Sequence, residues 1–232
     1  MKIAFVIPFS NKSSRFPCKI YKNFLGKPIW ENVVQGTKDI GLGEVFVMTD
    51  SFLIPGIRDT NRASCGSERA YNYFLRDPSF DWYISIPGDE PLVPSAELRR
   101  ILGEIGTWNR SAVHTCHCRF FNYGDVFDRR SCKMIVSKSG RVAYFSRSVI
   151  PGSKDGYLHP LEVYCKHYAM MAFHRDLLDS RDLWDGGEAE GLEQNKFLLK
   201  GVPVVSHRIE HIGFGIDTPD QLPQLEERVR FE

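Results

Sequence analysis

The stretch Ile3–Lys27, IAFVIPFSNKSSRFPCKIYKNFLGK, decides the fold class of this chain. It opens with an uninterrupted apolar run, which is typical of a parallel strand covered on both faces, and Pro8 is expected to end that strand. The loop beyond Pro8 is basic, and the first thirty residues of the chain contain no Asp or Glu. Its basic residues are Lys12, Arg15, Lys19, Lys22 and Lys27.

This basic loop is a candidate ligand site. Open α/β sheets bind ligands at the carboxyl ends of their strands, where this loop begins. Its charges suit a polyanion such as a nucleoside triphosphate. A solvated basic loop that binds nothing is the alternative interpretation of the same stretch.

Composition narrows the class of protein. The chain has 232 residues, 42% apolar and 25% charged, which is enough to bury the core of one large domain. A formal net charge of +1 creates no global field to attract nucleic acid or an anionic membrane. Six scattered cysteines fit reduced thiols, and neither a signal peptide nor a membrane-spanning run is recognisable. We therefore expect a cytoplasmic protein whose partners include neither nucleic acid nor a membrane.

The segments after the basic loop predict a parallel sheet. A helix is expected from Pro28 to a stop at Gly41, followed by a strand at Glu44–Met48. Strand, loop, helix and strand form a right-handed crossover unit, so the class is α/β. The Cys65–Ser67 turn then opens another helix with Ser67 as its N-cap, and backbone amides at such a turn can approach a ligand closely.

A second candidate site follows the strand expected at Asp81–Ile86. The turn Pro87–Pro91, PGDEP, holds two carboxylates between two prolines at the end of that strand. Mg²⁺ is usually held by one or two carboxylates together with substrate phosphates, which this placement suits. Acidic caps for a helix over Ser95–Ile105 are the alternative interpretation of Asp89 and Glu90.

From Ser111 onward the pattern predicts antiparallel structure. Lys133–Val136 and Arg141–Arg147 are expected to form a hairpin, and Val163–Phe173 a further strand. We interpret residues 119–174 as a strand-rich insertion that provides a dimer surface within a single domain, residues 1–232.

The last segment predicts a strand and a closing helix. The strand is expected at Val202–Ile209, and Thr218 and Gln221 form a start that resembles a capping box. Asp217 is thereby left just outside the helix, free to point elsewhere.

Six segments of the chain match a family pattern in the same order. They are Pro8–Lys19, Cys65–Ala70, Pro87–Pro91, Ala143–Pro151, Leu192–Gln194 and Gly215–Leu222. Together they resemble the motifs of the CMP-Kdo synthetases, the 3-deoxy-manno-octulosonate cytidylyltransferases. The motifs span nearly the whole chain, so the resemblance is specific although no single motif is.

The resemblance implies a Rossmann-like, GT-A-like nucleotidyltransferase with a mixed sheet and a dimerisation subdomain. It implies a homodimer that couples CTP to the anomeric hydroxyl of Kdo or a related sugar with Mg²⁺, giving a CMP-sugar and pyrophosphate. In-line attack on the α-phosphate requires the charge on the phosphates to be neutralised. Arg15 and Lys19 are therefore assigned to the β- and γ-phosphates. Asp89 and Asp217 are assigned to Mg²⁺, which lowers the pKa of the sugar hydroxyl.

The family motifs also imply two sets of binding residues. The nucleotide-binding set is Pro8, Ser10, Lys12, Ser14, Arg15, Lys19, Cys65, Gly66, Ser67 and Arg69. The cytosine is expected against the Cys65–Ser67 turn. The sugar-binding set is Pro87, Arg147, His167, Met171, Glu193 and Gln194.

Departures from the family pattern concentrate on the sugar side. Ser10 replaces an Arg of the phosphate loop, and Pro87 replaces a Gln before Gly-Asp-Glu. A Gly and two Tyr of a family strand become Ala169, Met171 and Phe173. A sugar other than Kdo therefore stays open, as do transfer to a sugar phosphate and a non-catalytic relative.

One further cluster contains metal-ligand residue types. On the strand expected there, His114, Cys116 and Cys118 face one way and His117 the other, so a tetrahedral zinc site would need donors from elsewhere. We interpret the segment as a plain sheet strand, with zinc binding as the alternative.

Overall fold

The computed structural model describes residues 1–10, 13, 15–59, 63, 65–179 and 190–231. The chain divides into two compact units, one formed by Met1–Trp108 with Ile212–Glu232 and the other by Asn109–His211. Strands and helices alternate in the first unit and strands dominate the second, which confirms the predicted mixed α/β class.

The first unit is built on a parallel sheet. Its strands, in spatial order, are β6 (Trp82–Ser85), β1 (Ile3–Phe9), β4 (Glu44–Thr49) and β5 (Ile57–Arg58). In the parallel register Val6 lies opposite both Phe46 and Ser85. The run from Ile3 to Ile7 is buried throughout, as expected for a strand covered on both faces.

The prediction that Pro8 ends the first strand is wrong. β1 continues through Pro8, which pairs with Met48 of β4, to Phe9. The Val6 carbonyl accepts from Ile86 N, so Val6 and, two residues on, Pro8 face the β6 side. The pairing with β6 ends before Pro8 is reached, so its missing N–H leaves no ladder bond unmade.

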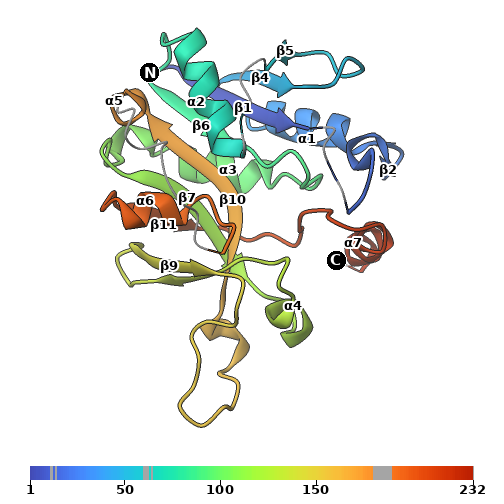
Figure 1. Cartoon of the computed structure of the whole chain (residues 1–232), viewed down its shortest axis with the longest axis vertical. Helices are drawn as coiled ribbons and strands as arrows, with labels where there is room; N and C mark the ends of the chain where they lie inside the picture. The colour runs from blue at the N-terminus through green and yellow to red at the C-terminus, as the bar shows by residue number, and fades with distance from the viewer. Residues whose placement is uncertain (11–12, 14, 60–62, 64, 180–189, 232) are drawn as a thin grey trace. The chain divides into compact units, whose positions relative to one another are not determined.

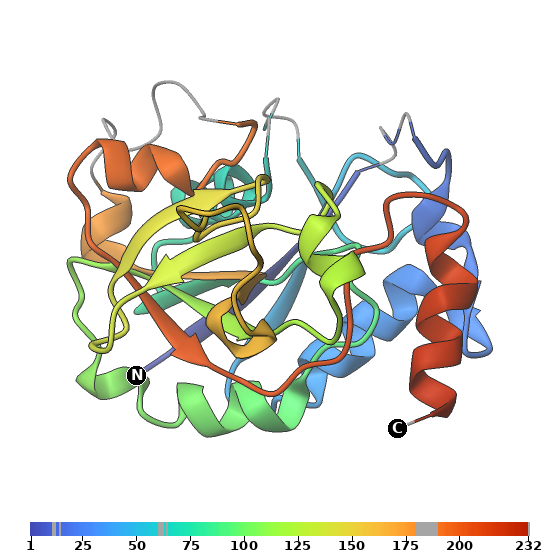
Figure 2. The same ribbon diagram turned by 90° about the horizontal axis from the view of Figure 1, so that it is seen from below.

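Helices cover both faces of this sheet. They are α1 (Ile29–Lys38), α2 (Gly66–Arg76) and α3 (Ser95–Leu102), while α7 (Gln221–Arg230) closes the chain. α1 and α3 lie together on one face and α2 lies on the other (Figure 2). Ser95 Oγ of α3 donates to the Gly36 carbonyl of α1 at 2.7 Å and so joins these two helices. α3 is shorter than predicted, because the chain after Leu102 forms the 3-10 turn Ile105–Thr107.

Ser67 is not the N-cap of α2, contrary to prediction. The helix begins at Gly66, and Cys65 occupies the cap position in an extended conformation with φ −147°. Ser67 is buried inside the first turn. The Ser85 hydroxyl donates to the Gly66 carbonyl at 3.4 Å, so the start of the helix is tied to β6 by that contact and not by a serine cap.

The second unit contains a mixed sheet. Its strands are β7 (Val113–Arg119), β8 (Lys133–Val136), β9 (Val142–Ser146), β10 (Cys165–His174) and β11 (Val204–Arg208). β7 pairs antiparallel with β10 and parallel with β11, while β8 pairs antiparallel with both β9 and β10. The predicted hairpin is confirmed. The strand predicted from Val163 begins at Cys165, because Leu161–Val163 form a 3-10 turn.

In the described part of this unit the sheet is accompanied by three short helices, namely α4 (Tyr123–Phe127), α5 (Arg175–Leu178) and α6 (Asn195–Leu199). The strand-rich segment 119–174 lies inside this unit, and its part in dimerisation stays a prediction. All six cysteines are free thiols, as expected. Among the described residues, no helix combines the length and apolar character needed to cross a membrane.

Candidate active site

The loops singled out in the sequence emerge at one edge of the first unit's sheet. β1, β4 and β6 are parallel, so their carboxyl ends lie at the same edge. Figure 1 shows the blue strand β1 running into the segment that carries β2 (Asn23–Phe24), with α7 on the same side. The basic loop, the Pro87–Pro91 turn and Asp217 are brought together there.

The four side chains predicted to be catalytic form one ion-pair cluster. Lys19 Nζ donates to Asp89 Oδ2 at 2.7 Å and to the Ile216 carbonyl at 2.8 Å. The same ammonium lies 3.6 Å from Asp217 Oδ1, which accepts a 2.8 Å hydrogen bond from Arg15 Nη2. The Lys19 side chain is only 12% exposed, whereas that of Arg15 is 58% exposed. Two carboxylates are thus paired with one enclosed and one solvated cation.

Close backbone packing holds the two carboxylates in place. A Cβ at Gly88 would collide with the Pro8 carbonyl, so only glycine lets the turn that carries Asp89 lie against the end of β1. Ile216 N donates to the Asp89 carbonyl at 2.9 Å, which joins the two acidic loops. Gln221 Oε1 accepts from Asp217 N at 2.7 Å and thereby caps the approach to α7.

A second ion-pair group lies at the end of β1, where the basic loop begins. Arg69 Nη1 donates to the Phe9 carbonyl at 2.6 Å, and Arg69 Nε lies 3.0 Å from Asp59 Oδ2. Asp50 Oδ2 accepts from Ser10 Oγ at 3.0 Å and lies 3.9 Å from Arg69 Nη2. Arg69, which is 8% exposed, therefore fastens α2 to the end of β1.

Sequence reasoning missed both carboxylates of this group. Asp50 follows β4 directly, at the edge where ligands bind, and that position is the signal that would have found it. Asp59 follows β5 in the same way, but this two-residue strand was not predicted from the sequence, so the position of Asp59 gave no signal.

The Cys65–Ser67 turn forms the start of α2. Cys65 Sγ and Ser67 Oγ are 3.6 Å apart, and Ser67 is buried. The first N–H groups of a helix have no intrahelical partner. The backbone of this turn therefore offers hydrogen-bond donors to the acceptor atoms of a nucleotide base. Two further nucleotide-binding predictions, Lys12 and Ser14, lie outside the described residues.

The second unit contains five of the six predicted sugar-binding residues. His167 Nε2 lies 2.8 Å from Thr115 Oγ1, whose hydroxyl donates to the Met170 carbonyl at 2.6 Å. Thr115 thus accepts from a protonated Nε2, which leaves His167 Nδ1 as an acceptor facing Gln194 Nε2 at 3.4 Å. Burial lowers the pKa of His167 to about 3, so the ring is neutral. Met171 lies on β10, the strand that contains His167, and is also buried.

Arg147 is tied to the segment that precedes Glu193. Its guanidinium donates to the carbonyls of Glu190 at 3.0 Å, Arg129 at 3.1 Å and Gly191 at 3.4 Å. The Glu190 carboxylate in turn accepts from Arg147 N at 2.7 Å and from Ser146 Oγ at 2.9 Å. Desolvation raises the pKa of Glu190, but these hydrogen bonds outweigh it and hold the pKa below its usual value. Glu190 was not anticipated from the sequence.

The histidines of β7 are engaged within the sheet. His114 Nε2 donates to the Asn109 carbonyl at 2.9 Å, so its Nδ1 accepts from His207 Nε2 at 3.0 Å. His117 Nδ1 lies 2.8 Å from Ser206 Oγ. Across the described part of the chain, no three His, Cys, Asp or Glu side chains gather to hold a metal ion.

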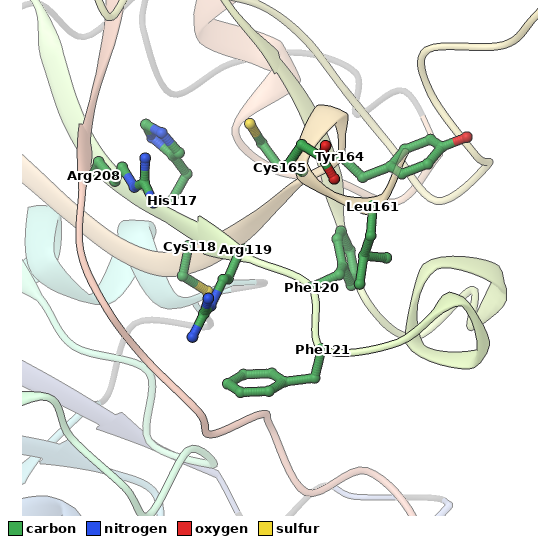
Figure 3. A pocket seen from close by; sticks show the side chains of 10 residues that line it. His117, Cys118, Arg119, Phe120, Phe121, Leu161, Tyr164, Cys165 and Arg208 are labelled. Atoms are coloured by element: carbon green, nitrogen blue, oxygen red, sulfur yellow. The ribbon is translucent and has the colours of Figure 1, made fainter. Parts of the chain in front are cut away.

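A pocket of about 480 Å³ opens in the second unit (Figure 3). Its walls combine Phe120, Phe121 and Leu161 with the cationic side chains of Arg119 and Arg208. Both arginines are close to Glu210, at 3.7 and 3.3 Å. The lining contains none of the predicted site residues.

Comparisons with known proteins agree with the motifs. Residues 4–209 match the family described as cytidylyltransferase. A 3-deoxy-manno-octulosonate cytidylyltransferase of Polynucleobacter necessarius subsp. necessarius is 27% identical over 240 residues, covering 97% of this chain and 93% of its own. The protein of the same name from Parabacteroides distasonis is 27% identical over 241 residues, covering 96% of each chain.

Two solved structures are similar to the whole chain. One, described as CMP:2-keto-3-deoxy-manno-octonic acid synthetase complexed with CTP, superposes with a TM-score of 0.85 at 25% identity and covers 100% of this chain and 99% of that one. A putative glucose-1-phosphate thymidylyltransferase of Bacillus anthracis has a TM-score of 0.69 at 12% identity, with 98% and 95% covered. The second likeness shows the fold alone.

Proposed function

Because the chain belongs to the cytidylyltransferase family, we propose that it couples CTP to the anomeric hydroxyl of 3-deoxy-manno-octulosonate or a related acidic sugar. The products are a CMP-sugar and pyrophosphate. The observation that carries this proposal is the cluster of Lys19, Arg15, Asp89 and Asp217 at the carboxyl edge of a parallel sheet. It provides both cations for a triphosphate and carboxylates for a metal ion.

The chemistry requires charge to be neutralised at the reacting phosphates. A bond forms between the sugar oxygen and the α-phosphorus, the bond from that phosphorus to the bridging oxygen breaks, and the hydroxyl proton is lost to solvent. Arg15 and Lys19 hold the β- and γ-phosphates and stabilise the departing pyrophosphate. The sugar oxygen attacks the α-phosphorus directly, so no covalent enzyme intermediate is needed.

Asp89 and Asp217 are the residues that would hold Mg²⁺. Carboxylate oxygens next to a triphosphate are the donor set that this ion prefers, and the two side chains face one shared cation in the structure. When bound, the metal lowers the pKa of the sugar hydroxyl. Asp89 and Asp217 supply the fixed positions from which that hydroxyl is aligned with the α-phosphorus.

On the sugar side, Arg147 is the group that supports an acidic substrate. Three of the five N–H groups of Arg147 are used by backbone carbonyls in the described structure, and the other two can pair with a carboxylate. His167 Nδ1 faces Gln194 Nε2 at 3.4 Å, so His167 contributes to the sugar side by positioning the Gln194 amide.

We further propose a cytoplasmic homodimer. Exposed apolar side chains of the second unit, including Phe127, Tyr157 and Val163, support the dimer, which gel filtration with light scattering tests.

Pyrophosphate release tests the reaction directly. Purified protein is given CTP, UTP, ATP or GTP with Mg²⁺ and a panel of ulosonic acids, pentoses and sugar 1-phosphates. Release from CTP with a free acidic sugar is expected. Release only with a sugar 1-phosphate would assign the alternative transferase, and no release with any pair would support a non-catalytic relative.

The departures at Pro87 and Met171 test which sugar is preferred. Neither side chain can hydrogen-bond a hydroxyl, unlike the Gln and Tyr of the family pattern, so the site cannot strongly favour a hydroxyl there. We expect Kdo to be a weak substrate, with a higher kcat/KM in the double variant Pro87→Gln/Met171→Tyr. Efficient use of Kdo by the wild type, without gain in the variant, would refute an altered pocket.

A further inference from the structure

Lys19 fills the space between the two carboxylates that the proposed function assigns to a divalent cation. Its ammonium contacts Asp89 Oδ2 at 2.7 Å and the Ile216 carbonyl at 2.8 Å, and lies 3.6 Å from Asp217 Oδ1. Ammonium groups and small divalent cations both bind carboxylate and carbonyl oxygens. The oxygens that a metal would need are therefore already engaged by a charged group of the chain itself.

A fixed turn places the lysine there. Its backbone belongs to the 3-10 turn Lys19–Tyr21, in which Ile20 is buried. Ile29 N donates to the Lys22 carbonyl at 2.9 Å and ties the end of this turn to the start of α1. With 12% of its side chain exposed, Lys19 is held between the acidic loops as part of the fold, and is not a surface side chain that approaches by chance.

The charges of this cluster balance without any metal. Asp89 and Asp217 bring two negative charges, and Lys19 and Arg15 bring two positive ones at 2.7 and 2.8 Å. A divalent cation that entered beside the ammonium would meet a like charge, and both carboxylates of this four-residue cluster are already paired with cations. The free protein should therefore bind such a cation weakly.

A triphosphate changes this balance. Its negative charges compete for Lys19, whose flexible four-carbon stem can turn toward them, and for Arg15, which is already 58% exposed. Each cation that turns to the phosphates releases a carboxylate. Asp89 and Asp217 then become available to a metal ion that the phosphates also attract.

We propose that Lys19 is a placeholder for the divalent cation, so that the metal binds poorly to the free protein and cooperatively with CTP. This inference rests on the proposed function, because it takes CTP and a divalent cation as the ligands. Binding coupling is reciprocal, so CTP must also bind more tightly when the metal is present. The role of Lys19 then extends from holding phosphate to setting the order in which the ligands assemble.

Mn²⁺ binding, followed by the electron paramagnetic resonance signal of the free ion, tests the proposal without any turnover. In nucleotide-free protein, Lys19→Met should tighten Mn²⁺ binding by about tenfold or more, because Met fills the same space without charge or a ligand oxygen. Lys22→Met removes the same charge from an exposed neighbour and should bind Mn²⁺ as the wild type does. Adding Asp89→Asn to Lys19→Met should abolish the gained site.

The wild type provides a second measurement that needs no variant. Saturating CTP, without sugar, should tighten Mn²⁺ binding after allowance for the Mn²⁺–CTP complex in solution. Nucleotide-free wild type that binds Mn²⁺ as tightly as Lys19→Met, or equally with and without CTP, would overturn the proposal. Absence of pyrophosphate release would instead refute the proposed function, since the nucleotide-free Mn²⁺ comparison does not depend on catalysis.

Discussion

At the scale of single residues, this protein places opposite charges within hydrogen-bond reach of one another at the edge of a parallel sheet. Asp89 and Asp217 come from loops that are distant in sequence, yet both face the ammonium of Lys19. Variants can test the predicted catalytic role of Asp89 and Asp217 separately from the part these residues play in the ion pairs.

Asp89→Asn and Asp217→Asn are each expected to lower kcat by about a thousandfold or more, which is roughly 4 kcal/mol of barrier. The amide keeps the shape of the side chain but removes the charge proposed to hold the metal. Pyrophosphate release measures the loss, and circular dichroism checks the fold. Asp220→Asn, which changes a nearby carboxylate that accepts from Gln224, is the matched control and should remain active. Near-normal turnover in either test variant would remove both carboxylates from the mechanism.

Thr115 is expected to position His167. Thr115→Val leaves His167 Nε2 and the Met170 carbonyl without their hydroxyl partner, which should lower the free energy of unfolding by about 2 kcal/mol. Thr115→Ser keeps the hydroxyl and should restore most of that loss. Nitrogen NMR shifts of His167 report the tautomer directly. An unchanged Nε2–H tautomer in Thr115→Val would show that Thr115 does not set it.

At the scale of secondary-structure elements, a buried lysine joins the turn before β8 to the end of β9. Lys133 Nζ donates to the carbonyls of Asp128 at 2.7 Å, Ser131 at 2.8 Å and Arg147 at 3.0 Å. The side chain is fully buried, and desolvation lowers its pKa. All three donors of the ammonium are used, so this charge stabilises a junction of strands and not a ligand.

Lys133→Met is therefore expected to destabilise the protein by on the order of 3 kcal/mol, because three partly buried carbonyls lose their donor. Lys138→Met, in the exposed turn of the β8–β9 hairpin, should change stability little. Urea unfolding followed by fluorescence measures both variants. Equal stabilities would mean that water replaces the ammonium without cost.

At the scale of the whole molecule, buried neutral histidines make stability depend on pH. Burial lowers the pKa values of four histidines in the second unit, namely His114, His117, His167 and His207. The unfolded chain takes up protons at these positions below about pH 6.5, whereas folded His207 does so near pH 4 and folded His167 near pH 3. Protons therefore bind preferentially to the unfolded chain, and stability falls as pH falls.

Urea unfolding at pH 7.5, 6 and 5 should show this loss, with each such histidine contributing up to about 1.4 kcal/mol per pH unit. The slope should be shallower in His207→Gln, which removes one of these groups. His159→Gln, which changes a partly exposed histidine, should keep the wild-type slope. A constant free energy of unfolding from pH 7.5 to 5 would contradict the assignment of neutral buried rings.

The order of the longer strands and helices and the chemical character of the main loops were determined by the sequence itself, whereas the short elements β5, α4 and α5 were not predicted. The apolar run at Ile3–Ile7 predicted a doubly covered parallel strand, because burial on both faces leaves no polar alternation. The hairpin of β8 and β9 followed from local alternation and a turn of small polar residues. The basic loop and the Pro87–Pro91 turn could be placed at the ligand-binding edge, because each follows a predicted strand.

Only the tertiary structure decided which charges meet. Lys19 and Asp217 are far apart in sequence, as are Arg69 and Phe9, and local periodicity carries no information about such pairs. The same holds for Thr115. Nothing in the sequence distinguishes it from other strand residues, and its contact with His167 depends on the position of β10. Residue type and local spacing determine which segments tend to form strands or helices and which chemical groups each loop carries. Hydrogen bonds between distant loops depend on how strands and helices pack, which no short stretch of sequence specifies by itself.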